Sequence, residues 1–154
     1  MKTTLILCLA ALTLAPLSSR AEKGEKANPI AVALGATGAQ AVFSNFFAIA
    51  ELADLYGAKA YDKQKSTQLA DTYGKLTESA KDSLTDLIDS GKLNKDDTAS
   101  VQEMVVINDL LGKMASGIKT YIKEPSDDNE AAYEKNRQKA WKAISKFLGI
   151  EDKE

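Results

Sequence analysis

Apolar residues recur at a spacing of three and four in four successive stretches of the chain, which is the period of one face of an α-helix. We expect helices over residues 29–56, 66–90, 97–123 and 127–148. No stretch shows the alternation of apolar and polar residues that predicts a β-strand. Amphipathic helices joined by short turns fold most simply as an up-down four-helix bundle, so we predict an all-α protein of that architecture.

Residues 29–50 form the most apolar stretch after the N-terminus and contain no charged residue, in a chain that is 27% charged. The stretch is long enough to cross a membrane. On a helix, however, a narrow polar stripe runs along one side, made of Thr37, Gln40, Ser44, Glu51 and Asp54. A narrow stripe beside a wide apolar arc is typical of a helix buried on most sides within a bundle. We therefore expect this helix to be the most buried of the four, and membrane insertion is not favoured.

The other three predicted helices each carry a regular apolar face. For residues 66–90 the expected core face is Leu69, Tyr73, Leu76, Ala80, Leu84 and Leu87. For residues 97–123 it is Met104, Ile107, Leu111, Met114, Ala115, Ile118 and Ile122. For residues 127–148 it is Tyr133, Ala140, Trp141, Ile144, Phe147 and Leu148.

Polar and glycine residues mark the ends of the predicted helices. Ser, Asp and Asn cap free N–H groups at a helix start, and glycine suits the position after a helix end. The expected N-caps are Asn28, Ser66, Asp96 or Asp97, and Ser126, and the expected stops after the second and fourth helices are Gly91 and Gly149.

The N-terminus has the pattern of a cleavable signal peptide. Lys2 precedes a short apolar run, residues 5–14, and Ser19 and Ala21 supply the small residues of a cleavage site. We predict a signal peptide over residues 1–21 and export, to the periplasm or outside the cell. The remaining chain divides into a flexible lead (22–27), the helical domain (28–149) and a polar tail (150–154).

Composition excludes several classes of function. Cys8 is the only cysteine and lies in the signal peptide, so the exported domain has no disulfide. Removal of Lys2 and Arg20 changes the formal net charge from −2 to −4, which argues against nucleic acid as a partner. The chain has no histidine, the commonest acid–base group and metal ligand. We find no catalytic constellation, and we expect a protein that is not an enzyme and needs no cofactor.

Three aspartates are a candidate metal site. Asp82, Asp86 and Asp89 lie at positions i, i+4 and i+7, on one helix face. Calcium and magnesium prefer such oxygen ligands. The simpler interpretation is a solvated acidic face that keeps an exported protein soluble.

Three hypotheses for the function remain open. The leading one is an interaction module that binds an unknown protein, or a second copy, through an exposed strip around Phe43 and Phe47. A second is a carrier of a small apolar ligand, held between the helices near Asn45, Tyr56 and Tyr73. The third is a membrane-inserting protein that uses the helix of residues 29–56.

Overall fold

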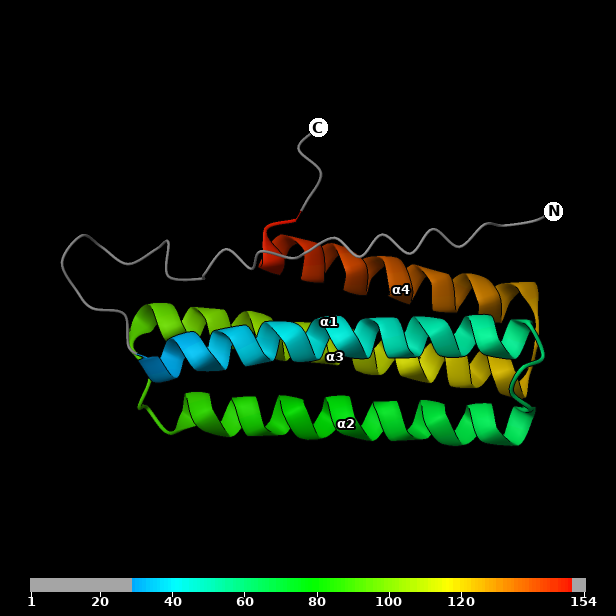
Figure 1. Cartoon of the computed structure of the whole chain (residues 1–154), viewed down its shortest axis with the longest axis horizontal. Helices are drawn as coiled ribbons and strands as arrows, with labels where there is room; N and C mark the ends of the chain where they lie inside the picture. The colour runs from blue at the N-terminus through cyan, green and yellow to red at the C-terminus, as the bar shows by residue number, and fades with distance from the viewer. Residues whose placement is uncertain (1–28, 151–154) are drawn as a thin grey trace.

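The computed structural model describes residues 29–150, which form four α-helices and no β-strand. The helices are α1 (Pro29–Gly57), α2 (Lys63–Asp89), α3 (Lys95–Lys123) and α4 (Asp127–Leu148). They pack against one another, and each runs opposite to the one before it (Figure 1). The prediction of an all-α fold of four packed helices is confirmed. The predicted signal peptide (1–21), the lead (22–27) and residues 151–154 of the predicted tail lie outside the described residues.

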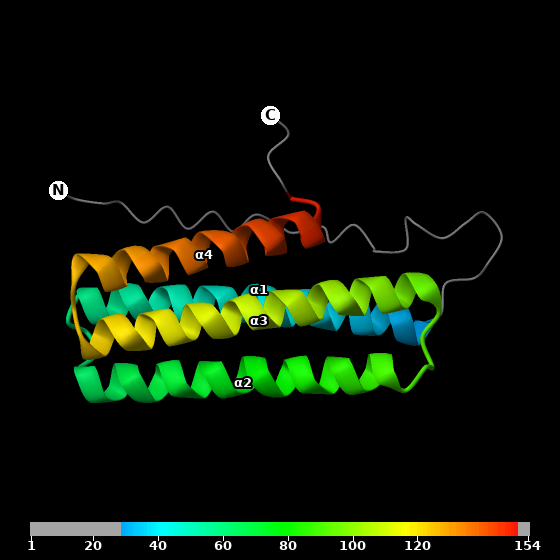
Figure 2. The same ribbon diagram turned by 180° about the vertical axis from the view of Figure 1, so that it is seen from behind.

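The two long helices α1 and α3 lie side by side in the middle, with α2 along one edge and α4 along the other (Figures 1 and 2). Helices α2 and α4 do not contact each other, whereas α1 and α3 do. The cross-section is therefore a flattened rhombus with α1 and α3 on its short diagonal. Helix α4 is the shortest, and the N-terminal ends of α1 and α3 extend beyond its last turn.

Helix α3 is the central helix of the fold, and the prediction that the first helix would be the most buried is wrong. Nine residues of α3 are buried, and α3 contacts both α2 and α4 more extensively than α1 does. In the most apolar window of α1, only 22% of the residues are buried. The reason is that much of the apolar arc of α1 consists of alanine and glycine, which satisfy the helical pattern without requiring a large partner surface.

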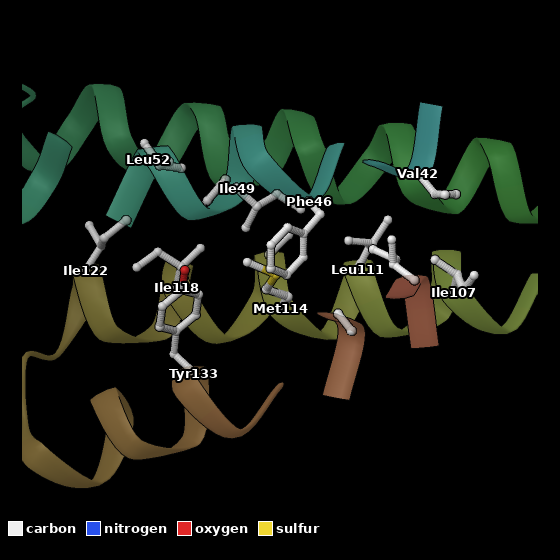
Figure 3. Close-up of a cluster of buried hydrophobic side chains, with 14 residues drawn as sticks. Val42, Phe46, Ile49, Leu52, Ile107, Leu111, Met114, Ile118, Ile122 and Tyr133 are labelled. Carbon is white, nitrogen blue, oxygen red and sulfur yellow. The ribbon is translucent and has the colours of Figure 1, made fainter. Parts of the chain in front are cut away.

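The hydrophobic core lies between α1, α3 and α4 (Figure 3). Every residue predicted on the core face of the third helix is buried, which confirms that face. Helix α1 contributes Val42, Phe46, Ile49 and Leu52, while its predicted polar stripe is exposed. Burial of these large side chains is the main stabilising term of the fold, at about 1.5–3 kcal/mol for each.

Helix α2 packs on α3 through small residues, and this corrects the predicted core face of the second helix. Its buried residues are Ser66, Ala70 and Thr77. A Cβ atom placed on Gly112 of α3 would lie only 3.4 Å from Oγ1 of Thr77. The two backbones therefore approach closely, and the leucine stripe of α2 turns toward the edge of the contact. Leu76, predicted in the core, is 51% exposed as a result.

Two of the predicted N-caps are displaced toward the N-terminus by a few residues. Asp62 caps α2, because its carboxylate accepts a hydrogen bond of 2.7 Å from the N–H of Lys65, and the predicted cap Ser66 lies in the buried α2–α3 contact. Asn94 caps α3 in the same way, and the predicted caps Asp96 and Asp97 lie in the first turn. Their negative charge there is favourable, since it faces the positive end of the helix dipole.

The predicted cap of the fourth helix and both glycine stops are confirmed. The hydroxyl of Ser126 accepts a hydrogen bond from the N–H of Asn129 at the start of α4. Gly91 and Gly149 adopt φ angles of +66° and +67°, a conformation that costs glycine little.

Candidate functional site

Four aromatic rings meet on the surface shared by α1 and α4. Phe43, Phe46 and Phe47 come from α1 and Trp141 comes from α4, with ring centroids 4.7 to 6.4 Å apart. Phe46 is buried at the base of the cluster, whereas Phe47 is 47% exposed and Trp141 is 37% exposed. We call Phe43, Phe47 and Trp141 the aromatic patch. Rings at these separations attract one another beyond the effect of burial alone, so the patch is a defined surface.

The patch partly matches the sequence prediction. Phe43 and Phe47 were predicted as an exposed strip, and the structure places both at the surface, with Phe43 half-buried. Trp141 was predicted in the core, and this is wrong, because it lies over Phe46 at the edge of the α1–α4 contact. Its neighbours in sequence, buried Ala140 and exposed Lys142, mark this edge position. Tryptophan is rarely buried completely, and that signal could have been used.

An open groove of about 900 Å³ continues the same face toward the start of α4. Apolar residues that line it include Ala50, Ala53, Ile118 and Ala131. Four carboxylates also line it, those of Asp54, Asp127, Glu130 and Glu134. The only basic residue of the lining, Arg137, is hydrogen-bonded to Glu134 through two contacts of 2.7 Å. We call this the acidic groove, because within residues 29–150 the other three carboxylates of its lining form no ion pair.

The Arg137–Glu134 pair stays charged. The hydrogen bond from Arg137 holds the pKa of the Glu134 carboxyl below its ordinary value, and the same bond raises the pKa of Arg137. Both side chains are about 40% exposed, so the pair contributes little to stability. Its effect is to fix the position of one carboxylate at the wall of the groove.

Tyr133 also lines the groove and extends from α4 toward Ile118 of α3 (Figure 3). The side chain is 6% exposed, and its hydroxyl has no hydrogen-bond partner among the described residues. Burial raises the pKa of Tyr133 to about 12, because the phenolate form would lose its hydration. The residue is therefore neutral at ordinary pH and acts as part of the core.

The charges of α4 are segregated along its length. Residues 127–134 contain four acidic residues and no basic one, whereas residues 135–148 contain five basic residues and no acidic one. The helix dipole explains such a bias only in the first and last turns. Four of the basic residues are exposed lysines, Lys135, Lys139, Lys142 and Lys146. Along α4, the end at the groove is therefore acidic and the part that carries Trp141 is basic.

A second groove, of about 400 Å³, follows the contact between α2 and α3. Its rim carries charges of both signs, including the ion pair between Asp71 and Lys119. The hydrogen bond from Lys119 lowers the pKa of Asp71. At the base Asn108 donates to the carbonyl of Met104, while its own carbonyl oxygen has no partner among the described residues. This groove is a crease between two closely packed helices.

The residues predicted to hold an apolar ligand are not gathered around either groove. Asn45, Tyr56 and Tyr73 are all half-buried, and none of them lines the acidic groove or the α2–α3 groove. The hydroxyl of Tyr56 donates to the carbonyl of Ile122 at 3.3 Å, which gives it a structural role between α1 and α3. No geometry among these three residues favours a carrier.

The candidate metal ligands Asp82, Asp86 and Asp89 are exposed on α2. Within residues 29–150, no group of three or more Asp, Glu, His or Cys side chains is arranged to hold a metal ion. The structure thus shows the three aspartates on an exposed face of α2.

One helix in the described part of the chain is long and apolar enough to cross a membrane. It is α1 over Val32–Gly57, with a mean hydropathy of 1.4 in its most apolar window. This criterion considers only the length and composition of a helix. The core helix of a soluble protein and an N-terminal signal sequence meet it as well. Glu51 and Asp54 lie within this span and are exposed.

Comparison with known proteins identifies no relative of this chain. No protein family matches it, and neither a curated protein nor a solved structure matches it. The function must therefore be inferred from the arrangement of this chain's own residues.

Proposed function

We propose that this protein is an exported, non-enzymatic up-down helical bundle that binds protein through its α1–α4 face. The exposed pair Phe47 and Trp141 is the observation that carries this proposal. Aromatic side chains are enriched in protein interfaces, where they bury a large area at a small cost in conformational entropy. A rigid base supports them here, because both rings contact buried Phe46.

The chemistry of the face also suits binding. The carboxylates and lysines beside the patch are exposed or paired at the surface, and such groups give specificity and rate of association at an interface rim. Export is supported by the pattern of residues 1–21, and a domain without cysteine would then rely on packing alone.

Site-specific photo-crosslinking in the native host tests the proposal. A benzophenone amino acid replaces Phe47, and in a matched control it replaces Leu76 of α2, which is 51% exposed. We expect irradiation to give a discrete protein adduct from position 47 and none from position 76, because both sites are equally accessible but only one lies in the proposed interface. Equal adduct patterns from the two positions, or no adduct from either, would contradict the proposal.

Membrane insertion is the second candidate, and the low burial of α1 favours it specifically. Only 22% of the apolar window of α1 is buried, so part of the helix could enter a bilayer without large loss of core contacts. The test is limited proteolysis with and without lipid vesicles. Protection of residues 29–57 that depends on lipid would support insertion, and identical cleavage patterns would exclude it.

A further inference from the structure

We propose that the α1–α4 face binds a second copy of the same chain in an antiparallel, twofold-symmetric dimer. This inference rests on the proposed function and names its partner. Two properties of the face support this arrangement. Its charge pattern and its shape are each complementary to those of a second copy rotated by 180°.

The charge pattern selects the antiparallel arrangement. On α4 the acidic half, residues 127–134, is followed by the basic half, residues 135–148. A twofold axis perpendicular to α4 places the basic half of one copy over the acidic half of the other. A twofold axis parallel to the helices would instead place lysines on lysines, which is repulsive. The segregation extends through the middle of the helix, where the dipole does not require it.

The shape of the face gives the same register. Trp141 projects at one end, and the acidic groove, lined by Ala131 and Glu130, lies at the other. Ten residues separate Trp141 from Ala131, about 15 Å along a helix. A twofold axis at the level of Asn136, midway between them, brings Trp141 of one copy to the groove of the other, and the reverse contact follows by symmetry.

The same axis pairs the charges without further adjustment. Lys142 lies as far beyond residue 136 as Glu130 lies before it, so Lys142 of one copy reaches the level of Glu130 of the other along the helix. Lys146 and Asp127 are matched within one residue of this register. Each twofold dimer would contain every such contact twice, with the aromatic rings at its centre and the ion pairs at its rim.

Sedimentation equilibrium of the purified protein, over a range of concentration and at low and high salt, measures the dimer directly. Trp141 is the only tryptophan, so its emission reports on the same contact. We expect the molar mass to rise from monomer to dimer with concentration and the emission to shift to shorter wavelength in parallel. High salt should weaken association, because the rim pairs are screened.

Charge reversal tests the register. Lys142→Glu and Glu130→Lys should each weaken dimerisation about tenfold, since each change acts at two symmetric contacts. The two changes combined in one chain should restore association to within about threefold of the starting protein. Lys92→Glu, at an exposed site between α2 and α3, is the control and should leave association unchanged.

Each outcome decides the proposal. A monomer at every concentration, with an unshifted Trp141 emission, overturns the dimer. If position 47 still crosslinks to a different protein, the proposed function stands and only the identity of the partner is wrong. A dimer that Lys142→Glu does not weaken, or that the combined variant does not restore, overturns the antiparallel register. An emission shift that requires lipid vesicles would assign the face to a membrane.

Discussion

Two contacts of the edge helices, that of α2 with α3 and that of α4 with α1, are built in opposite ways. Helix α2 meets α3 through alanine, glycine, serine and threonine, and the backbones lie so close that a Cβ on Gly112 would contact Thr77. Helix α4 meets α1 through large aromatic rings that hold the two helices apart, with an open groove beside them. The first contact buries small side chains between neighbouring backbones, and the second leaves aromatic surface exposed to solvent.

This difference shows that an apolar stripe in the sequence does not locate a buried contact. Helix α2 has the more regular stripe, yet Leu76 within it is half exposed and the buried residues are small or polar. Dispersion attraction depends on the number of atoms in close contact, and small residues achieve this by bringing backbones together. Among the exposed large apolar side chains of residues 29–150, those of Phe47 and Trp141 are the aromatic ones.

Replacing one alanine by leucine in each of the two contacts should give the largest difference in stability between them. Ala115→Leu adds side-chain atoms at a site that is 1% exposed and faces Gly74, so we expect a loss of about 3 kcal/mol in the free energy of unfolding. Ala131→Leu makes the same change in the acidic groove, where there is room, and should change stability by less than about 0.5 kcal/mol. Urea unfolding measures both. Equal losses would show that the two contacts are equally tight.

Tyr133 should make the α1–α4 side of the core sensitive to alkali. Its pKa is raised by burial from 10 to about 12 in the folded protein, so the unfolded chain releases this proton first. The contribution of the neutral phenol to the free energy of unfolding is fully present below pH 10 and is lost as the pH rises through about 12. The loss amounts to about 2 to 3 kcal/mol.

The variant Tyr133→Phe isolates this effect. It keeps the ring and removes the titrating hydroxyl, which has no partner among the described residues. Urea unfolding of both proteins between pH 10 and 12 should show the starting protein losing stability faster than the variant. Parallel pH profiles would mean that the hydroxyl is hydrated in the folded state.

The ion pair at the rim of the α2–α3 contact should have the smallest effect. Asp71→Asn removes the carboxylate that binds Lys119, so we expect a slight fall in melting temperature at neutral pH and low salt. The pKa of Asp71 is lowered, so the contribution is present above its ordinary value of 3.8 and disappears as the pH falls through the lowered value. A difference in melting temperature that persists at high salt would show that packing is responsible, since screening removes only the charge effect.

The core face of α3 from Met104 to Ile122 could be predicted from the sequence, although buried Val101 was missed, whereas the placement of the edge helices could not. The pattern from Met104 to Ile122 has large apolar residues on one face, and a helix with such a face has few ways to bury it. Helix α2 offers two adjacent stripes, one of leucines and one of small residues, and the small one packs where Gly112 of α3 lets Thr77 approach.

The candidate site was predictable in part for a similar reason. Phe43 and Phe47 stand out because they lie at the edge of the apolar arc of an uncharged helix. Trp141 and the acidic groove depend on how far α4 stands from α1, which is a tertiary property. The caps Asp62 and Asn94 were missed because both helices begin in polar segments, where hydrophobic periodicity gives no boundary.

The short length of α4 makes the two ends of the molecule unequal in their local motion. Its 22 residues cover about 33 Å, whereas the 29 residues of α1 and of α3 cover about 44 Å. In residues 32–40 of α1, only Gly35 and Ala39 are buried, so separating this segment from its neighbours exposes little apolar surface. Amide hydrogens there can exchange with solvent through local opening, whereas those around Leu111 at the centre of α3 exchange only when the whole domain unfolds.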